Sequence, residues 1–125
     1  MTDNSTIAAL FDQWNAALQT LDPDQVVALY ANDAVLLPTL SNTVRHNHAE
    51  LKDYFVSFLQ KRPKGTINES NVRDLGNTAV HSGIYTFALT ANGETSEAKC
   101  RFTFVYGKDG DHWKIIEHHS SLMPE

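Results

Sequence analysis

The sequence of 125 residues contains a single cysteine, Cys100, no run of 18 apolar residues and no cluster of lysine and arginine. One cysteine excludes an internal disulfide bond and is typical of a reducing compartment. The lack of a long apolar run excludes a membrane-spanning helix. Ten basic against fifteen acidic residues argue against nucleic acid or an anionic membrane as a partner. Since residues 1–5 show no signal-peptide pattern, we expect a cytoplasmic protein.

The composition is that of an ordinary globular domain, with 42% hydrophobic and 20% charged residues. A chain of this length can bury about two-thirds of its unfolded surface, so its folding requires no metal or disulfide. Its six histidines are not accompanied by clustered carboxylates, and this pattern favours no metal site. We therefore predict one domain, residues 1–125, without a metal or cofactor.

Helical patterns dominate the first half. Apolar residues recur at helical spacing over residues 7–21 and 51–59, which predicts two amphipathic helices. Asp22, followed by proline, is typical of the start of a further short helix, which we expect to run through Tyr30. Asn47, three residues before a glutamate, is typical of the residue that caps the later helix.

The second half has the character of a sheet. Residues 66–76 are extended and polar, and the following segments are rich in β-branched and aromatic residues. The dipeptides Asn92-Gly93 and Asp109-Gly110 are typical of hairpin turns. The order predicts an α+β fold in which three helices of the N-terminal half pack on one face of a curved, mainly antiparallel sheet. The predicted strands are 34–37, 43–45, 66–76, 79–90, 98–106 and 113–121.

This order resembles the nuclear transport factor 2-like (NTF2-like) superfamily, which includes SnoaL-like and ketosteroid-isomerase-like proteins. The chain is most similar to the association (hub) domain of calcium/calmodulin-dependent protein kinase II and its stand-alone bacterial relatives. The segments that carry the likeness are Asp33-Ala34-Val35, Tyr54-Phe55, 101–106 (RFTFVY) and 113–121 (WKIIEHHSS).

The resemblance implies a cone-shaped, cystatin-like fold with a cavity at its open end. It also implies a homodimer or larger closed assembly formed through the sheet face. It implies no kinase activity, because the chain lacks the Gly-rich loop and the catalytic motifs of kinases. The kinase hub has cavity arginines on its middle strands and after the last-strand histidine. Here Thr86 or Tyr85 stands near the first place, and Ser120 follows His119.

Arg101 is the strand cation that could take a similar role. A two-residue turn at Asp109-Gly110 would pair it with His118, in the middle of the sheet. An arginine there needs a carboxylate partner or an anionic ligand. We hypothesise that Arg101 lies in the cavity and binds a ligand carboxylate. The alternatives are an ion pair with Glu97, Glu117 or another carboxylate, or exposure on the far side of the sheet.

Six further residues are candidates for the cavity wall, because aromatic and imidazole groups combine an apolar body with a polar tip. His118 and His119 are adjacent on one strand, so they point to opposite faces, and the sequence leaves open which one faces the cavity. Two functions are compatible with this set. One is a self-assembling module that binds a small carboxylate-bearing or hydrophobic ligand. The other is a small cofactor-independent enzyme, an isomerase, cyclase or hydrolase. The six candidates are His118, His119, Tyr85, Trp14, Tyr30 and Tyr54.

Overall fold

The computed structural model describes residues 4–39 and 41–124, so the first three residues of the N-terminal segment lie outside the described part. Helices lead the chain and strands end it, as the sequence predicts. The elements are α1 (Asn4–Gln19), α2 (Pro23–Val27), β1 (Tyr30–Leu37), α3 (His48–Phe58), the 3₁₀ helix η1 (Leu59–Lys61), β2 (Lys64–Asp74), β3 (Thr78–Ala91), β4 (Glu94–Asp109) and β5 (His112–Leu122).

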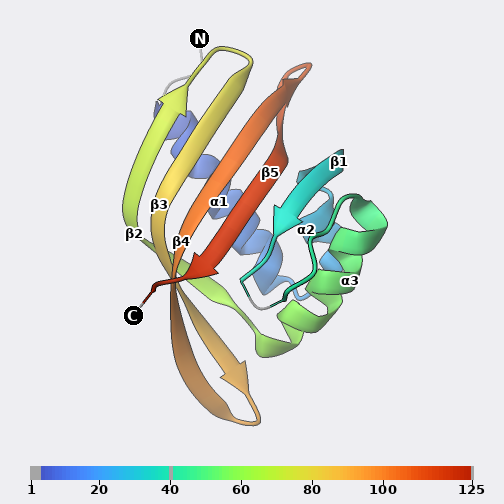
Figure 1. Cartoon of the computed structure of the whole chain (residues 1–125), viewed down its shortest axis with the longest axis vertical. Coiled ribbons are helices and arrows are strands. Elements are labelled where there is room, and N and C mark those ends of the chain that lie inside the picture. The colour runs from blue at the N-terminus through green and yellow to red at the C-terminus, as the bar shows by residue number, and fades with distance from the viewer. Residues whose placement is uncertain (1–3, 40, 125) are drawn as a thin grey trace.

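The strands form one sheet in the order β1-β5-β4-β3-β2. Strands β2 to β5 are an antiparallel meander, and β1 joins the edge of β5 in parallel. Helix α1 lies behind the meander in Figure 1, α3 packs against β1, and α2 contacts both α1 and α3. The predicted α+β fold, with helices on one sheet face, is therefore confirmed.

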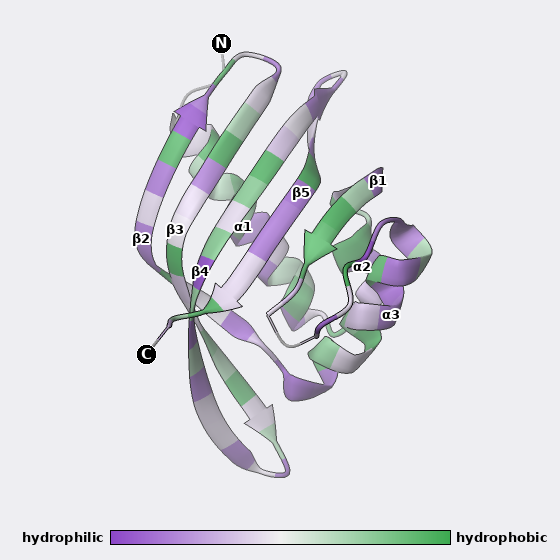
Figure 2. Ribbon diagram, in the orientation of Figure 1, coloured by the Kyte–Doolittle hydropathy of each residue, from purple (hydrophilic) through white to green (hydrophobic). Residues whose placement is uncertain are grey.

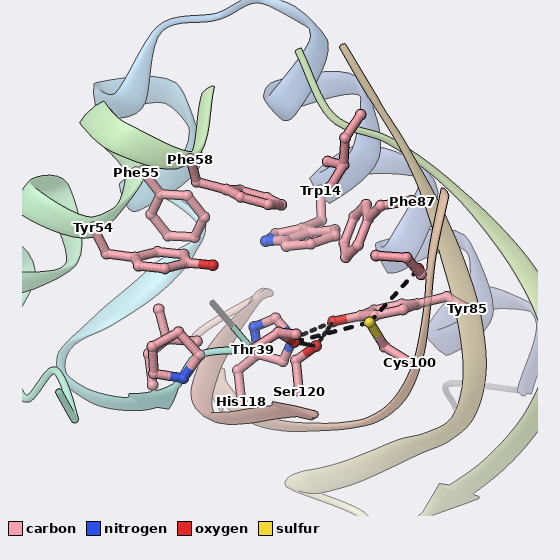
Figure 3. A pocket seen from close by; sticks show the side chains of 14 residues that line it. Trp14, Thr39, Tyr54, Phe55, Phe58, Tyr85, Phe87, Cys100, His118 and Ser120 are labelled. Atoms are coloured by element: carbon pink, nitrogen blue, oxygen red, sulfur yellow. Dashed lines mark hydrogen bonds between the residues drawn. The ribbon is translucent and has the colours of Figure 1, made fainter. Parts of the chain in front are cut away.

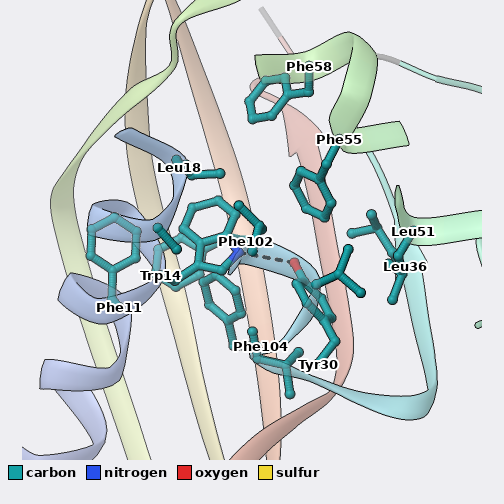
Figure 4. Close-up of a cluster of buried hydrophobic side chains, with 14 of the residues drawn as sticks. Phe11, Trp14, Leu18, Tyr30, Leu36, Leu51, Phe55, Phe58, Phe102 and Phe104 are labelled. Carbon is teal, nitrogen blue, oxygen red and sulfur yellow. Dashed lines mark hydrogen bonds between the residues drawn. The ribbon is translucent and has the colours of Figure 1, made fainter. Parts of the chain in front are cut away.

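The core lies between α1, α3 and the inner face of the sheet, which is the face turned to the helices. Its largest anchor is Trp14 of α1, which is 2% exposed. The indole contacts Phe104 edge-on at 5.2 Å between ring centroids and stacks near Tyr85 at 6.2 Å. Phe55 of α3 reaches the same cluster through Tyr30 (Figure 4). In Figure 2 hydrophobic and hydrophilic residues alternate along β3 and β4, as expected for strands with two different faces.

Two helix starts follow their predicted caps. The Asp22 side chain accepts from the backbone N–H of Asp24, and the Asn47 side chain accepts from that of Glu50. Each bond satisfies one of the N–H groups that a helix start leaves unpaired.

Two of the predicted boundaries in this region are wrong. Helix α2 ends at Val27 and does not reach Tyr30, because the Leu29 carbonyl accepts a 2.9 Å bond from the Ile115 N–H and the chain enters the sheet. The strand predicted at 43–45 is reduced to one isolated bridge between Leu36 and Arg45.

The two hairpins differ in how well their turns match the prediction. At Asn92-Gly93 both residues have positive φ, 55° and 79°, which this turn type requires, and Arg101 pairs with Ile84 as expected. At the β4–β5 turn Asp109 pairs with His112, so the loop is one residue further along than predicted.

The register between β4 and β5 also contains an irregularity. The displaced turn moves the partner of Arg101 from His118 to Ser120, and a bulge at Ile116, opposite Val105 and Tyr106, moves it by one residue more, so Arg101 faces Ser121 and Phe104 faces His118. A one-residue shift turns the side chains beyond it to the other sheet face. The predicted pair of Arg101 and His118 is therefore wrong.

We predict that Trp14→Ala lowers the free energy of unfolding by roughly 3–5 kcal/mol, because truncation of a buried indole leaves a cavity among side chains that relax only in part. Chemical denaturation followed by circular dichroism measures the loss. A loss below about 1 kcal/mol would mean that the indole contributes little to packing in solution.

Candidate functional site

An aromatic cavity lies between α1, α3 and the inner face of the sheet (Figure 3). The centre of a water molecule can occupy about 20 Å³ of this cavity, which is room for about one water. The whole space between its walls, with the mouth included, is about 380 Å³. Its wall is mostly apolar, and its polar groups gather where β5 meets the loop after β1. The lining residues are Trp14, Leu36, Pro38, Thr39, Tyr54, Phe55, Phe58, Tyr85, Phe87, Leu89, Ala98, Cys100, His118 and Ser120.

His118 lies at the centre of the polar groups, on the inner face of β5. Its Nδ1 is 2.9 Å from the Tyr30 hydroxyl, and its Nε2 is 3.2 Å from the Tyr85 hydroxyl. The Trp14 indole N–H donates to the Tyr30 oxygen at 3.1 Å. Four elements, α1, β1, β3 and β5, thus contribute to one buried network.

The network continues from Tyr85 to the cavity mouth. The Tyr85 hydroxyl donates to Ser120 Oγ at 2.7 Å. Ser120 Oγ is hydrogen-bonded to Thr39 Oγ1, and Thr39 donates to Cys100 Sγ at 3.9 Å. Hydrogen bonds through hydroxyl and thiol groups therefore extend along the cavity wall, as the dashed lines in Figure 3 show for its outer part.

Burial keeps each titratable group of the network in its neutral form. It lowers the pKa of His118 to about 3, and His119 nearby adds to the shift. Burial also raises the pKa of Tyr30 and Tyr85 well above the usual value, and that of the Cys100 thiol. A charged form would lose its hydration without gaining an opposite charge. At neutral pH these groups of the wall therefore carry no charge.

The structure brings five of the seven candidates together and separates two. Trp14, Tyr54, Tyr85 and His118 line the cavity, and Tyr30 lies directly behind His118. Arg101 and His119 are exposed on the opposite face of the sheet.

The expected cavity position of Arg101 is therefore wrong. Its strand alternates as predicted, but Phe102 and Phe104 face the helices, which leaves Arg101 and Val105 on the outer face. No ion pair joins Arg101 to Glu97 or Glu117 in the part of the chain that the structure describes, so the alternative of exposure holds.

Sequence reasoning missed three members of the wall with a hydroxyl or thiol group, Thr39, Cys100 and Ser120. Ser120 stands two positions after His118 and therefore shares its sheet face, so correct placement of the histidine would have identified it. Thr39 follows β1 in a loop, and the sequence held no signal for its place beside Ser120.

The structure shows no basis for a metal site or a membrane span among residues 4–39 and 41–124. These residues contain no group of three or more histidine, cysteine or acidic side chains that could hold a metal ion. No helix among them is long and apolar enough to cross a membrane.

The helix-covered sheet and the cavity define a protein with the NTF2-like, cystatin-like fold. An NTF2-like superfamily protein from Salmonella enterica superposes with a TM-score of 0.83 over 98% of this chain and 92% of its own, at 15% identity. The calcium/calmodulin-dependent protein kinase II hub homology domain of Chlamydomonas reinhardtii gives a TM-score of 0.81 over 98% and 99%, at 17% identity. At these identities the likeness concerns the fold alone.

The family follows from two further matches. The model of the calcium/calmodulin dependent protein kinase II association domain matches residues 3–124. A structure from Xanthomonas campestris that is named for the same domain has 52% identity and a TM-score of 0.98, over 100% of this chain and 91% of its own. The chain belongs to the calcium/calmodulin dependent protein kinase II association domain family. No match was found among curated protein sequences.

We predict that His118 makes stability depend on pH. Its pKa is about 3 in the folded protein and near 6.5 in the unfolded chain, so the unfolded state takes up a proton first as the pH falls. The stabilisation is fully present above about pH 6.5 and is lost as the pH falls towards 3, with a slope of up to ~1.4 kcal/mol per pH unit. Denaturation at pH 5 to 7, above the range of most carboxyl groups, measures this slope.

His118→Asn is the matched variant, and it should reduce the slope by about one proton. His81 is also buried with a lowered pKa, so it keeps a contribution of the same sign in both proteins. NMR resonances of the His118 ring that titrate near pH 6.5 in the folded protein would contradict the prediction.

Proposed function

We propose that this protein is a stand-alone self-assembling domain, a homodimer or larger closed assembly formed through the outer face of the sheet, and that its cavity holds a small molecule. The main observation in favour of the assembly is that the two sheet faces of this association-domain family member differ in how they are covered. One face is covered by helices, and the other, turned to the viewer in Figure 1, carries none of the helices in the described part of the chain.

The outer face has the composition of a surface that a partner could cover. The paired residues Val80 and Val105 lie in its middle and are half-buried, as is Ile84 beside Arg101. Ile116 at the bulge is 38% exposed. An aliphatic centre with a charged rim is typical of protein interfaces. A second copy of the chain, related by a twofold axis, would cover this centre with the same residues.

The cavity has the features of a small-molecule site. It is concave and mostly apolar, with a few polar groups at one end. We do not propose the predicted carboxylate ligand, because the lining residues include no lysine or arginine and the His118 ring is neutral. A hydrophobic ligand stays as the proposal.

The arrangement favours binding over acid–base catalysis. A general base works best with a pKa near the working pH, whereas burial moves the pKa of His118 down and that of Tyr85 up. No aspartate or glutamate is among the lining residues in the described part of the chain. The enzyme alternative therefore lacks a specific group in its favour.

We predict that Val105→Asp dissociates the assembly, because each copy would bury an uncompensated charge at the centre of the interface. Sedimentation at micromolar concentration should show a species heavier than the 14.0 kDa monomer for the natural chain and a lighter one for the variant.

Val56→Asp is the matched control, since Val56 is 46% exposed on α3, on the helix-covered side of the sheet. It should leave the mass unchanged. A natural chain that sediments only at 14.0 kDa would contradict self-assembly, and a variant with unchanged mass would place the interface elsewhere.

A further inference from the structure

The hydrogen bonds of the cavity wall run in one donor-to-acceptor direction, and Trp14 is the first donor. An indole N–H can only donate, and here it donates to the Tyr30 oxygen. If His118 Nδ1–H also donated to that oxygen, the Tyr30 proton would be left without an acceptor among the residues that the structure describes, in a side chain that is 1% exposed. An unpaired buried donor is costly. The Tyr30 hydroxyl therefore donates to His118 Nδ1.

This bond determines the tautomer of His118. A neutral imidazole has one ring proton, and burial keeps the ring neutral. With Nδ1 acting as the acceptor, the proton is on Nε2, which lies 3.2 Å from the Tyr85 oxygen. His118 therefore donates to Tyr85, and the Tyr85 proton goes to Ser120 Oγ at 2.7 Å.

The remaining hydroxyl protons point the same way. Thr39 donates to Cys100 Sγ, so the bond between Thr39 and Ser120 takes its proton from Ser120. The Cys100 thiol in turn lies 3.7 Å from the Ala98 carbonyl oxygen. Every proton from Trp14 to Cys100 is thus committed, and the unused capacity of these oxygens consists of lone pairs.

We propose that this one-way chain makes the polar end of the cavity a hydrogen-bond acceptor, and that the cavity takes a small neutral aromatic molecule with an O–H or N–H donor, of which phenol is the simplest. The inference rests on the ligand-binding part of the proposed function. A donor gains a bond to a lone pair of Tyr85, Ser120 or Thr39 without breaking one. A neutral acceptor must take a proton from an existing bond, and a carboxylate would lose its hydration without meeting a cation.

The walls of the cavity suit a single aromatic ring. Trp14, Phe55, Phe58 and Phe87 surround it, and the Tyr54 ring lies across from the polar end (Figure 3). Aromatic pairs gain from edge-to-face and offset contacts. With space for about one water at rest, a ring must displace these side chains slightly, so small guests are favoured over large ones.

The first test measures the chain without any ligand. NMR with ¹⁵N-labelled histidine at pH 7 identifies which ring nitrogen of His118 carries the proton. We expect Nε2–H in the natural protein and a substantial Nδ1–H population in Tyr30→Phe, which removes the donor to Nδ1. A natural protein with the proton on Nδ1 would overturn the proposal.

The second test compares three probes with one ring: phenol, benzonitrile and benzoate. Calorimetric titration should give phenol about tenfold tighter binding than benzonitrile, the factor that corresponds to one net hydrogen bond, and no measurable binding of benzoate. Equal or tighter binding of benzonitrile or benzoate would overturn the acceptor assignment and leave a binding cavity. Failure of all three to bind would overturn the ligand-binding function and this inference with it.

Two variants separate the chain from its surroundings. Ser120→Ala removes the acceptor of the Tyr85 proton, so that proton becomes available to a ligand and the preference for phenol should disappear or reverse. Thr86→Val removes a hydroxyl outside the cavity, which donates to Asn68, and should leave the preference unchanged. Thermal unfolding checks that both variants fold. If Ser120→Ala does not fold, the probe series on the natural chain tests the proposal by itself. An unchanged preference in a folded Ser120→Ala, or its loss in Thr86→Val, would contradict the proposal.

Discussion

The burial of a neutral histidine at the inner face of β5 is the constraint on which the rest of the structure depends. An imidazole that is 2% exposed must have partners for both nitrogens, and His118 finds them in Tyr30 and Tyr85. Those two tyrosines belong to β1 and β3, and the Trp14 indole of α1 is bonded to one of them. The position of the first helix relative to the last strand is thereby fixed by polar contacts inside an otherwise apolar core.

Much of the fold could be predicted because its signals are local. The periodicity of α1, the caps at Asp22 and Asn47 and the turn at Asn92-Gly93 each depend on a few neighbouring residues. The errors fall where a distant partner decides. Helix α2 stops before Leu29 because Ile115, far along the chain, takes its carbonyl, and no pattern near Leu29 shows this.

The site was harder to predict because a shift of one residue in strand register turns every side chain beyond it to the other face of the sheet. Both the alternation of β4 and the candidate set of aromatic residues were available from the sequence. What the sequence did not show was the bulge at Ile116 of β5, which lies opposite Val105 and Tyr106. Without the bulge His118 would share a face with Arg101; with it, His118 pairs with Phe104 and stacks on that ring at 4.0 Å. The energetics favour this outcome, since it buries the neutral ring and leaves the guanidinium in solvent.

The bulge also separates two kinds of chemistry along one strand. Beyond it, His118 and Ser120 point inward to the cavity, while His119 and Ser121 point outward with Glu117 and Arg101. Charge is thus confined to the outer face, where water or a rim of interface residues can solvate it. The polar side chains on the inner face are neutral and form hydrogen bonds with one another. These hydrogen bonds are stronger there because little water competes for them. Changes to alternate residues of β5 should therefore act on either the cavity or the outer surface, although the residues are neighbours in sequence.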